Sequence, residues 1–244
     1  MKSRFIYRAL KARCRDQRSE IEAALAALRA GDTAVDAGAH KGAYVYWLRK
    51  AVGPSGRVFA FEPQPRLAQY LRTVCERMQW PNVSVSDCAL SDVAGTGTLY
   101  VPGQGDSPGA SLQEAVLQTD PGHSHPCAMD TLDHQLAGAG RVALLKVDVE
   151  GHELRVFRGA ARILSADAPV ILFECEARHL RGHSMEDVFA YLESLGYAGS
   201  FFCGRALLPL TAFSAAVHQK RDTERFWDRP GYCNNFLFRR ECGA

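Results

Sequence analysis

The chain has 244 residues, with 29 Lys and Arg against 27 Asp and Glu and a formal net charge of +2. This length fits one α/β domain with additional segments, and the near balance of charge excludes a global field that would draw the protein to nucleic acid or a membrane. The eight cysteines are scattered without a C-x-x-C pair, which favours reduced thiols in the cytoplasm over disulfides or zinc.

Residues 1–30 predict a helical extension in front of a domain at residues 31–244. The basic start lacks the apolar core and cleavage site of a signal peptide, and no stretch approaches the roughly 18 to 20 apolar residues of a membrane span. Phe5, Ile6 and Leu10 would line one face of a basic amphipathic helix. This pattern favours a helix that packs on the domain or caps its pocket over one that touches a membrane.

Short apolar runs alternate with helical segments in the first half of the domain. Strands are predicted at 33–38, 56–63 and 82–90, and helices at 42–53 and 66–79, which end at Gly53-Pro54 and before Pro81. The order of these elements is βαβαβ.

An extended segment at 95–102 is followed by residues rich in Gly, Pro, Ser and Asp. Their composition predicts an insertion loop at about 102–128, of the kind that serves as a lid or a binding segment. His123 and His125 lie in this loop, where we expect solvent exposure and not metal binding.

Strands and helices then alternate again. Strands are predicted at 141–151, 168–176, 198–203 and 234–240, and helices at 152–166 and 184–196. Together the patterns predict a doubly wound, Rossmann-like α/β fold with a seven-stranded, mostly parallel sheet and helices on both faces. Ligands of such sheets bind beyond the carboxyl ends of the strands.

The first strand ends in DAGAHKG, residues 36–42. A dinucleotide fingerprint would have a glycine where His40 stands, and Asp36 would repel a phosphate group. A cationic ligand without phosphate fits better, and S-adenosylmethionine carries a positive amine and sulfonium. Glu62, at the end of the next strand, is placed to accept hydrogen bonds from the ribose hydroxyls.

Several segments extend this pattern over roughly residues 33–240. They are FEPQP at 61–65, DCALSD at 87–92, TLDH at 131–134, LLKVDVEGHELRVFRGA at 144–160, ILFE at 171–174 and NNFLF at 234–238. With the D-x-G-x-x-x-G turn, they resemble the FkbM family of S-adenosylmethionine-dependent methyltransferases, in the class I superfamily. DVEGHE at 148–153 is the most specific segment, and His40 departs from the Asn that is common in the family.

The resemblance implies positions for the cofactor. Asp36, Gly38, His40 and Gly42 would form the turn beside the methionine part, Glu62 would hold the ribose, and Asp87, Cys88 and Ala89 would flank the adenine. Asp87 could instead cap the following turn, and the Cys88 sulfur is expected to be a small buried apolar group.

The candidate catalytic residues are Asp148, Glu150, His152 and Glu174. Methyl transfer is an in-line displacement, and an oxygen acceptor must also lose a proton. In one mechanism His152 or Glu150 takes this proton. In the other, Asp148 and Glu174, with Glu150 as an optional third ligand, hold Mg²⁺ or another divalent cation that lowers the pKa of the acceptor hydroxyl.

Structural roles are the alternatives for these residues and for Lys146. Glu150 and Glu153 could stabilise a helix N-terminus, and His152 could be exposed. Lys146 stands on an apolar strand, so we expect a structural ion pair, with Asp133 as a candidate partner.

The predicted function is an O-methyltransferase for a hydroxyl of a small molecule, which the family resemblance specifies as a sugar, glycolipid or secondary metabolite. The lid and the segment 211–232, with Phe226, Trp227 and Tyr232, would set acceptor specificity, and Asn234 and Asn235 would lie at the pocket rim. The alternatives are N-methylation, nucleic acid methylation, disfavoured by the absence of a basic stripe, and a noncatalytic cofactor-binding module. The oligomeric state stays open, with a homodimer as one option.

Overall fold

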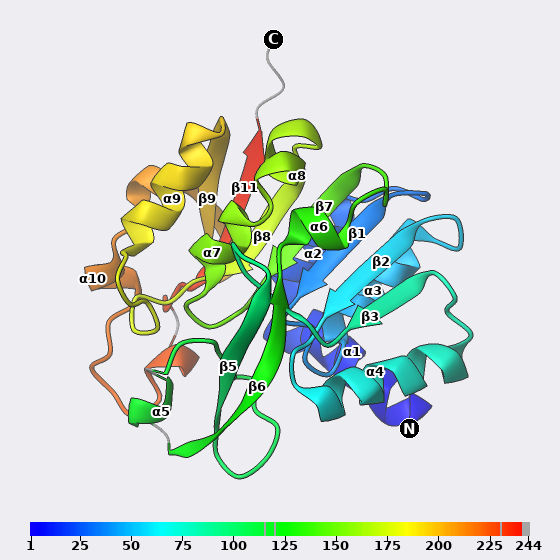
Figure 1. Ribbon diagram of the computed structural model, residues 1–244. Coiled ribbons are helices and arrows are strands. Elements are labelled where there is room, and N and C mark those ends of the chain that lie inside the picture. Colours follow the sequence, from blue (N-terminus) through cyan, green and yellow to red (C-terminus); the bar gives the residue numbers. More distant parts are fainter. Residues whose placement is uncertain (115, 120, 230, 241–244) are drawn as a thin grey trace.

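The computed structural model describes residues 1–114, 116–119, 121–229 and 231–240, and the side chains of Thr119 and Asp228 are left out of the description. The chain folds around an eight-stranded sheet with the order β10-β9-β11-β8-β7-β1-β2-β3 (Figure 1). These strands are β1 Thr33–Ala37, β2 Arg57–Phe61, β3 Val83–Ser86, β7 Val142–Val147, β8 Val170–Glu174, β9 Tyr197–Cys203, β10 Ala206–Pro209 and β11 Asn235–Arg240.

The five strands β8, β7, β1, β2 and β3 are parallel, and β11, β9 and β10 add antiparallel pairs at one edge. The predicted doubly wound α/β fold is therefore confirmed, with eight strands in the main sheet where seven were expected. The additional strand is β10, which forms a hairpin with β9 through a two-residue turn, and Gly204 supplies its positive φ of 60°.

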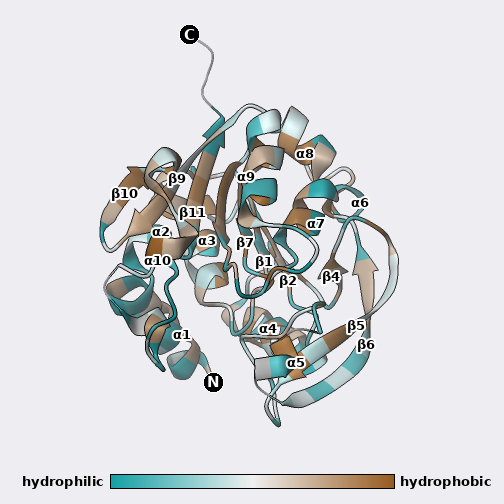
Figure 2. Cartoon of the chain, turned by 90° about the vertical axis from the view of Figure 1, so that its left-hand side faces the viewer, coloured by the Kyte–Doolittle hydropathy of each residue, from teal (hydrophilic) through white to brown (hydrophobic). Residues whose placement is uncertain are grey.

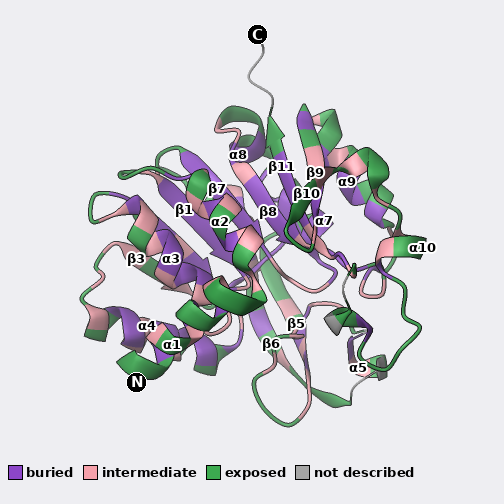
Figure 3. Cartoon of the chain, turned by 180° about the vertical axis from the view of Figure 1, so that it is seen from behind, coloured by how far each residue is buried: buried purple, intermediate pink, exposed green. Residues whose placement is uncertain are grey.

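Strands β1 and β7 are buried along their whole length (Figure 3). Side chains alternate between the two faces of the sheet, so that Leu144 and Leu172 join one hydrophobic cluster while Leu145 and Phe173 join the other. Burial on both faces explains why these strands are almost entirely apolar in sequence.

One face of the sheet is covered by the N-terminal helices, and the other by helices from the second half of the chain. The first group comprises α1 Lys2–Lys11, a π-helical turn at Ala12–Asp16, α2 Arg18–Ala26, α3 Ala43–Val52 and α4 Pro65–Met78. The second group comprises α6 Leu132–Gln135, α7 Glu153–Arg158, α8 Ala161–Ala166 and α9 Met185–Ser194. The connections contain two short helices, α5 Val116–Thr119 and α10 Ala215–His218, and two 3₁₀ turns, Leu210–Ala212 and Phe226–Asp228.

The expected packing of the first helix on the domain is observed, but Leu10, which was expected on the packed face with Phe5, is 43% exposed. Phe5 and Ala9 of α1 and Ile21 of α2 are buried in the cluster that contains Val45 and Leu48 of α3. Figure 2 shows hydrophobic colour along β9 and β11 of the sheet, whereas α1 carries both hydrophilic and hydrophobic residues. In the described residues, no helix combines the length and apolar character that crossing a bilayer requires.

A second, three-stranded sheet forms an arm at one end of the molecule (Figure 1). Its strands are β4 Ala89–Leu90, β5 Gly95–Pro102 and β6 Gly122–Asp130. Strands β5 and β6 are antiparallel: Gly95 pairs with Met129 at one end of the ladder, and Pro102 pairs with Gly122 at the other. The predicted loop at 102–128 is therefore a loop only in its first part. Strand β6 escaped prediction because its residues do not alternate between apolar and polar, and five of the nine are exposed, including His123, while His125 is half-buried.

Candidate functional site

A cavity of about 300 Å³ lies at the carboxyl ends of β1, β2 and β7. It is lined by Gln17, Ala37, Gly38, His40, residues 61–64, residues 88–90, Leu99, Pro108, residues 110–112, residues 148–150, His152 and Glu174. Nine of the predicted site residues thus converge here, namely Gly38, His40, Glu62, Cys88, Ala89, Asp148, Glu150, His152 and Glu174. Asp36, Gly42 and Asp87 lie outside the lining.

The turn after β1 needs glycine for two different contacts. Gly38 has φ +79°, and a Cβ at this position would lie 1.8 Å from the carbonyl oxygen of Asp148, so the ends of β1 and β7 could not approach as they do. Gly42 has φ +76°, and its Cβ would meet Leu71 at 2.5 Å. Gly42 therefore shapes the start of α3 without touching the cavity.

His40 has φ +47°, a left-handed conformation in which Asn is common among non-glycine residues. His40 therefore permits the same turn as the Asn that the resemblance leads us to expect at this position. The backbone N–H of His40 donates to Glu62 Oε2 at 2.7 Å. Burial, followed by the charge of Lys41, lowers the pKa of the imidazole to about 4, so His40 is neutral near pH 7.

Glu62 is buried, and three N–H groups orient its carboxylate. Besides His40, the backbone N–H and the Nε2 amide of Gln64 donate to Oε1 at 3.0 and 3.1 Å. Desolvation nevertheless raises the pKa of Glu62. Each carboxylate oxygen has two lone pairs, so Oε2, which accepts only from His40, can accept one further hydrogen bond from a ligand in the cavity.

Gln64 is a site residue that the sequence analysis missed. Its Nε2 donates to the carbonyl of Ser107 at 2.9 Å, and the Ser107 N–H donates back to Oε1 at 2.8 Å. The loop after β5 is thereby tied to the residue that orients Glu62. A Gln before Pro65 looks like an ordinary helix start, so the sequence held no signal for this contact.

Asp36 is buried behind the cavity and faces Lys146. The Lys146 Nζ lies 3.2 Å from Asp36 Oδ1 and 3.3 Å from Asp148 Oδ2, and donates to the carbonyl of Gly38 at 3.2 Å. Burial opposes the charge of Lys146, but Asp36 and Asp148 together raise its pKa. The expected ion pair of Lys146 is present.

The suggested partner Asp133 was wrong. Asp133 lies in the first turn of α6, and its carboxylate accepts from the backbone N–H groups of Arg162 and Ile163 at 2.8 and 3.0 Å. It therefore serves the start of α8. In the predicted adenine region, Cys88 and Ala89 line the cavity, whereas the half-exposed Asp87 pairs with Arg72 at 3.0 Å.

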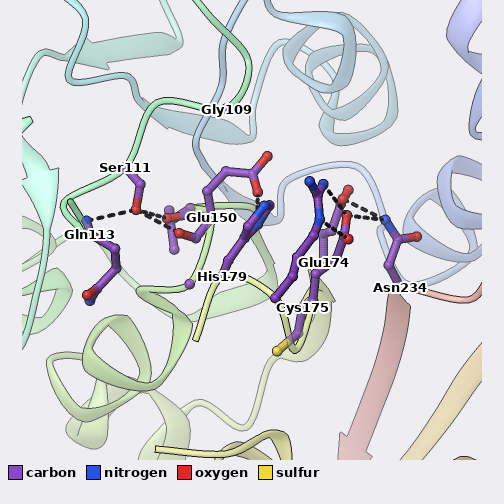
Figure 4. Close-up of polar contacts among 12 residues, drawn as sticks. Gly109, Ser111, Gln113, Glu150, Glu174, Cys175, His179 and Asn234 are labelled. Atoms are coloured by element: carbon purple, nitrogen blue, oxygen red, sulfur yellow. Dashed lines mark hydrogen bonds and ion pairs between the residues drawn. The ribbon is translucent and has the colours of Figure 1, made fainter. Parts of the chain in front are cut away.

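Three carboxylates meet at the edge of the cavity. Oxygen atoms of Asp148, Glu150 and Glu174 all lie within 4.8 Å of one another. Figure 4 shows that Glu150 is held by His179, at 2.5 Å from Nδ1, and Glu174 by Asn234, whose Nδ2 donates at 2.6 Å. Desolvation, followed by the nearby Asp148 and Glu150 charges, raises the pKa of Glu174 well above its ordinary value.

Glu150 also has an elevated pKa. Desolvation is the main cause, and the hydrogen bond from His179 opposes it. The backbone of Glu150 is left-handed, with φ +53°, and the Ser111 hydroxyl donates to its carbonyl at 2.6 Å. These contacts direct Glu150 toward the cavity edge and away from a helix-capping role.

His152 is buried, which contradicts the alternative of an exposed side chain. Its Nε2 lies 3.0 Å from Ser91 Oγ, and its Nδ1 lies 3.3 Å from the Gln113 amide nitrogen. Because the Ser91 hydroxyl donates to Asp92, we assign the imidazole proton to Nε2 and a lone pair at Nδ1 that accepts from Gln113. Burial lowers the pKa of His152 to about 4, so this arrangement leaves no free basic nitrogen.

Glu153 has a structural contact at the same turn. It is buried, and its Oε1 accepts from the backbone N–H of Gly151 at 2.9 Å. Burial raises its pKa to about 8.

A second cavity of about 750 Å³ adjoins the first and shares Gln17, Pro108, Glu150 and Glu174 with it. The rest of its lining includes Ala12, Asp16, Glu176, Arg178, His179, Trp227, Asn234 and Asn235. Of the predicted aromatic residues, Trp227 lines this cavity. Phe226 is buried under Arg178, and the Tyr232 hydroxyl donates to Glu176.

The family model of the methyltransferase FkbM domain matches residues 36–198. The chain belongs to the FkbM methyltransferase family. This membership confirms the predicted family, whose matched model is a methyltransferase domain. A comparison with curated proteins gives no match.

Solved structures agree with this fold. The chain resembles a methyltransferase FkbM from Methylobacillus flagellatus KT at 19% identity and a TM-score of 0.53, covering 86% of this chain and 43% of that one. It thus spans less than half of the Methylobacillus protein. A putative methyltransferase from Streptococcus mutans in complex with SAH has 9% identity, a TM-score of 0.51, and coverage of 93% of this chain and 98% of that one. A putative rRNA-methylase from Clostridium thermocellum has 10% identity, a TM-score of 0.51, and coverage of 92% and 95%.

Proposed function

We propose that this FkbM methyltransferase transfers a methyl group to a hydroxyl of a small molecule, with the cofactor in the 300 Å³ cavity and the acceptor in the 750 Å³ cavity. The observation that carries the proposal is the pair of carboxylates, Glu150 and Glu174, that lines both cavities. A reacting methyl group would pass between the two spaces beside these groups.

The residues of the smaller cavity suit S-adenosylmethionine. Glu62 has one lone pair left, on Oε2, for a ribose hydroxyl, and the turn at Gly38 and His40 leaves the backbone accessible beside the methionine part. Cys88 and Ala89 supply a small, mostly apolar wall for the adenine. The acids near the opposite end favour a sulfonium and an amine, because opposite charges attract strongly where water is excluded.

Proton removal is assigned to the carboxylates. The acceptor oxygen forms a bond to the methyl carbon, the carbon–sulfur bond breaks, and its electron pair stays on sulfur. The acceptor proton passes to Glu174 or Glu150. A raised pKa makes either group a better base than an ordinary carboxylate, whereas both nitrogens of His152 already have partners.

A divalent cation is the competing mechanism. The three carboxylates offer hard oxygen ligands, and a separation within 4.8 Å is compatible with ligands at about 2.0–2.6 Å from one ion. Asp148, Glu150 and Glu174 would hold the ion, which would supply Lewis-acid activation of the acceptor hydroxyl.

The acceptor cavity carries more acidic than basic side chains. Asp16, Glu150, Glu174 and Glu176 line it, while Arg178 is paired with Glu176 at 2.6 Å and His179 with Glu150. This surplus disfavours phosphate-bearing acceptors, including nucleic acid. An uncharged compound with several hydroxyl groups fits the carboxylates, the Asn234 and Asn235 amides and the Trp227 ring. Sugars, glycolipids and secondary metabolites therefore stay the proposed classes.

The test uses tritiated methyl groups and defined acceptors. Purified protein with labelled S-adenosylmethionine should label neutral sugars, glycolipids or polyketide alcohols, and omission or chelation of Mg²⁺ separates the two mechanisms. Base-stable labelling at oxygen supports the proposal. Labelling of amines or of ribosomal RNA in place of hydroxyl compounds would contradict it.

A further inference from the structure

Helix α1 has an apolar stripe on the face that points away from the domain. Phe5 and Ala9 are buried, and Tyr7 lies about halfway around the helix from both of them. Tyr7 is 66% exposed and Leu10 43% exposed. Cys14 continues this stripe at helical spacing and is exposed as well. A surface helix of a globular protein normally has polar residues there.

The stripe is bordered by positive charge. The first 18 residues contain seven Lys and Arg and one Asp, although the whole chain has a net charge of only +2. Arg8 and Arg13 are engaged with the domain: Arg8 donates to the Tyr70 hydroxyl at 3.2 Å, and Arg13 lies over the Trp47 ring at 4.4 Å. These contacts fix the orientation of the helix.

Three of the remaining five basic residues form ion pairs, among them Arg18 with Glu22 at 2.9 Å. Lys11 and Arg15 share Asp16, at 3.2 and 3.3 Å, and Lys2 and Arg4 make no ion pair within the described ranges. The surface that combines the Tyr7, Leu10 and Cys14 stripe with Lys2, Arg4, Lys11 and Arg15 is called the α1 face below. Exposed apolar side chains next to the unpaired Lys2 and Arg4, and next to the exposed Lys11 and Arg15, match an anionic lipid surface, in which aromatic and aliphatic groups insert and Lys and Arg meet head groups.

We infer that the α1 face docks the protein on an anionic bilayer, with Tyr7 and Leu10 inserted at the level of the lipid head groups. A nucleic acid would use the charges but not the apolar stripe. Docking would also bring the 750 Å³ cavity close to the bilayer. The chain runs from α1 directly into Ala12, Asp16 and Gln17, which lie in the wall of that cavity. In Figures 1 and 3, α1 lies toward the same end of the molecule as the β5–β6 arm.

The experiment measures sedimentation of the full chain with phosphatidylcholine vesicles that contain or lack phosphatidylglycerol, without cofactor or acceptor. We expect binding only with phosphatidylglycerol, and weaker binding as salt rises. The double variant Tyr7→Ser/Leu10→Ser should bind about tenfold more weakly. Lys2→Glu/Arg4→Glu should weaken binding to a similar extent, because it reverses two charges that would meet the anionic head groups. The helix should persist in this variant, because Glu is favourable near a helix N-terminus.

The matched control changes exposed apolar residues elsewhere. Leu207 and Val217 are 44% and 68% exposed, and Leu207→Ser/Val217→Ser should bind like the unchanged protein. Thermal melting and binding of S-adenosylhomocysteine, which should be unaltered in all variants, establish that they are folded.

Three results would overturn the inference. They are unchanged vesicle binding by Tyr7→Ser/Leu10→Ser, equal binding to vesicles that lack phosphatidylglycerol, and binding to short duplex RNA but not to vesicles. Each concerns vesicle or RNA binding alone, so it is distinguishable from failure of the proposed methyl transfer.

Discussion

Asp36 lies on β1, and Glu62 directly follows the adjacent parallel strand β2. Their surroundings give the two carboxyl groups different roles. Asp36 faces the Lys146 ammonium behind the cavity, whereas Glu62 lines the cavity and is oriented by three N–H donors. Burial raises the pKa of both carboxyl groups. The direct grip on the cofactor is therefore expected from Glu62, while Asp36 fixes the turn from behind.

Glu62→Ala should weaken S-adenosylhomocysteine binding by at least about tenfold, since a hydrogen bond to a charged group contributes about 1.5–3 kcal/mol. Calorimetric titration measures this change. Asp87→Ala is the control, because Asp87 is turned toward Arg72, and it should bind nearly as well as the unchanged protein. An affinity of Glu62→Ala within twofold of the unchanged protein would refute the ribose assignment.

Glu174→Gln should retain cofactor binding and lose most of the methyl transfer. As a base, Glu174 must be deprotonated, and its pKa is raised. Activity should therefore fall as pH drops through that raised pKa, at a higher pH than for an ordinary carboxylate. A pH profile of kcat/KM measures this acidic limb, and the residual activity of Glu174→Gln should lack it. If the variant keeps both the rate and the limb, Glu174 is not the base.

At the scale of elements, the site depends on how closely the strand ends approach one another. Gly38 allows the turn after β1 to contact the carbonyl of Asp148, and that contact places Asp148 beside Lys146. The first part of the insertion is held at the cavity by Gln64 and Ser107. The short connections between the elements therefore position the side chains that line the cavity.

Gly38→Ala and Gly103→Ala separate backbone strain from steric exclusion. Both glycines have nearly the same φ, +79° and +78°, but a Cβ at Gly103 would meet nothing within 4 Å. Gly103→Ala should cost about 1–2 kcal/mol of unfolding free energy from its left-handed backbone. Gly38→Ala should cost more and also weaken cofactor binding. Urea unfolding measures the difference, and equal losses would show that the Asp148 contact is not restrictive.

At the scale of the whole molecule, the N-terminal helices belong to the core of the sheet domain. Phe5 packs in the same cluster as residues of α3, α4 and β1, and its ring lies edge-to-face with Tyr46 and Trp80. A contact of this extent couples the first helix to the folding of the sheet.

Phe5→Ala should lower the unfolding free energy by about 3–5 kcal/mol, the usual cost of deleting a buried aromatic side chain. We expect a single unfolding transition at lower temperature, followed by circular dichroism and by tryptophan fluorescence. Tyr7→Ala, on the exposed side of the same helix, is the control and should change stability little. Two separate transitions would indicate that the helix melts on its own.

The sequence by itself determined the alternating α/β order, the glycine turn, the acids at the strand ends and the family, because periodicity and short motifs are local properties of the chain. It could not determine the partner of Lys146, the role of Gln64, strand β6, or the hydrogen bonds that engage both ring nitrogens of His152. These features depend on contacts between residues far apart in the chain, such as Lys146 with Asp36 and His152 with Ser91. Only the tertiary structure brings such groups within hydrogen-bonding distance and sets their burial, on which their protonation depends.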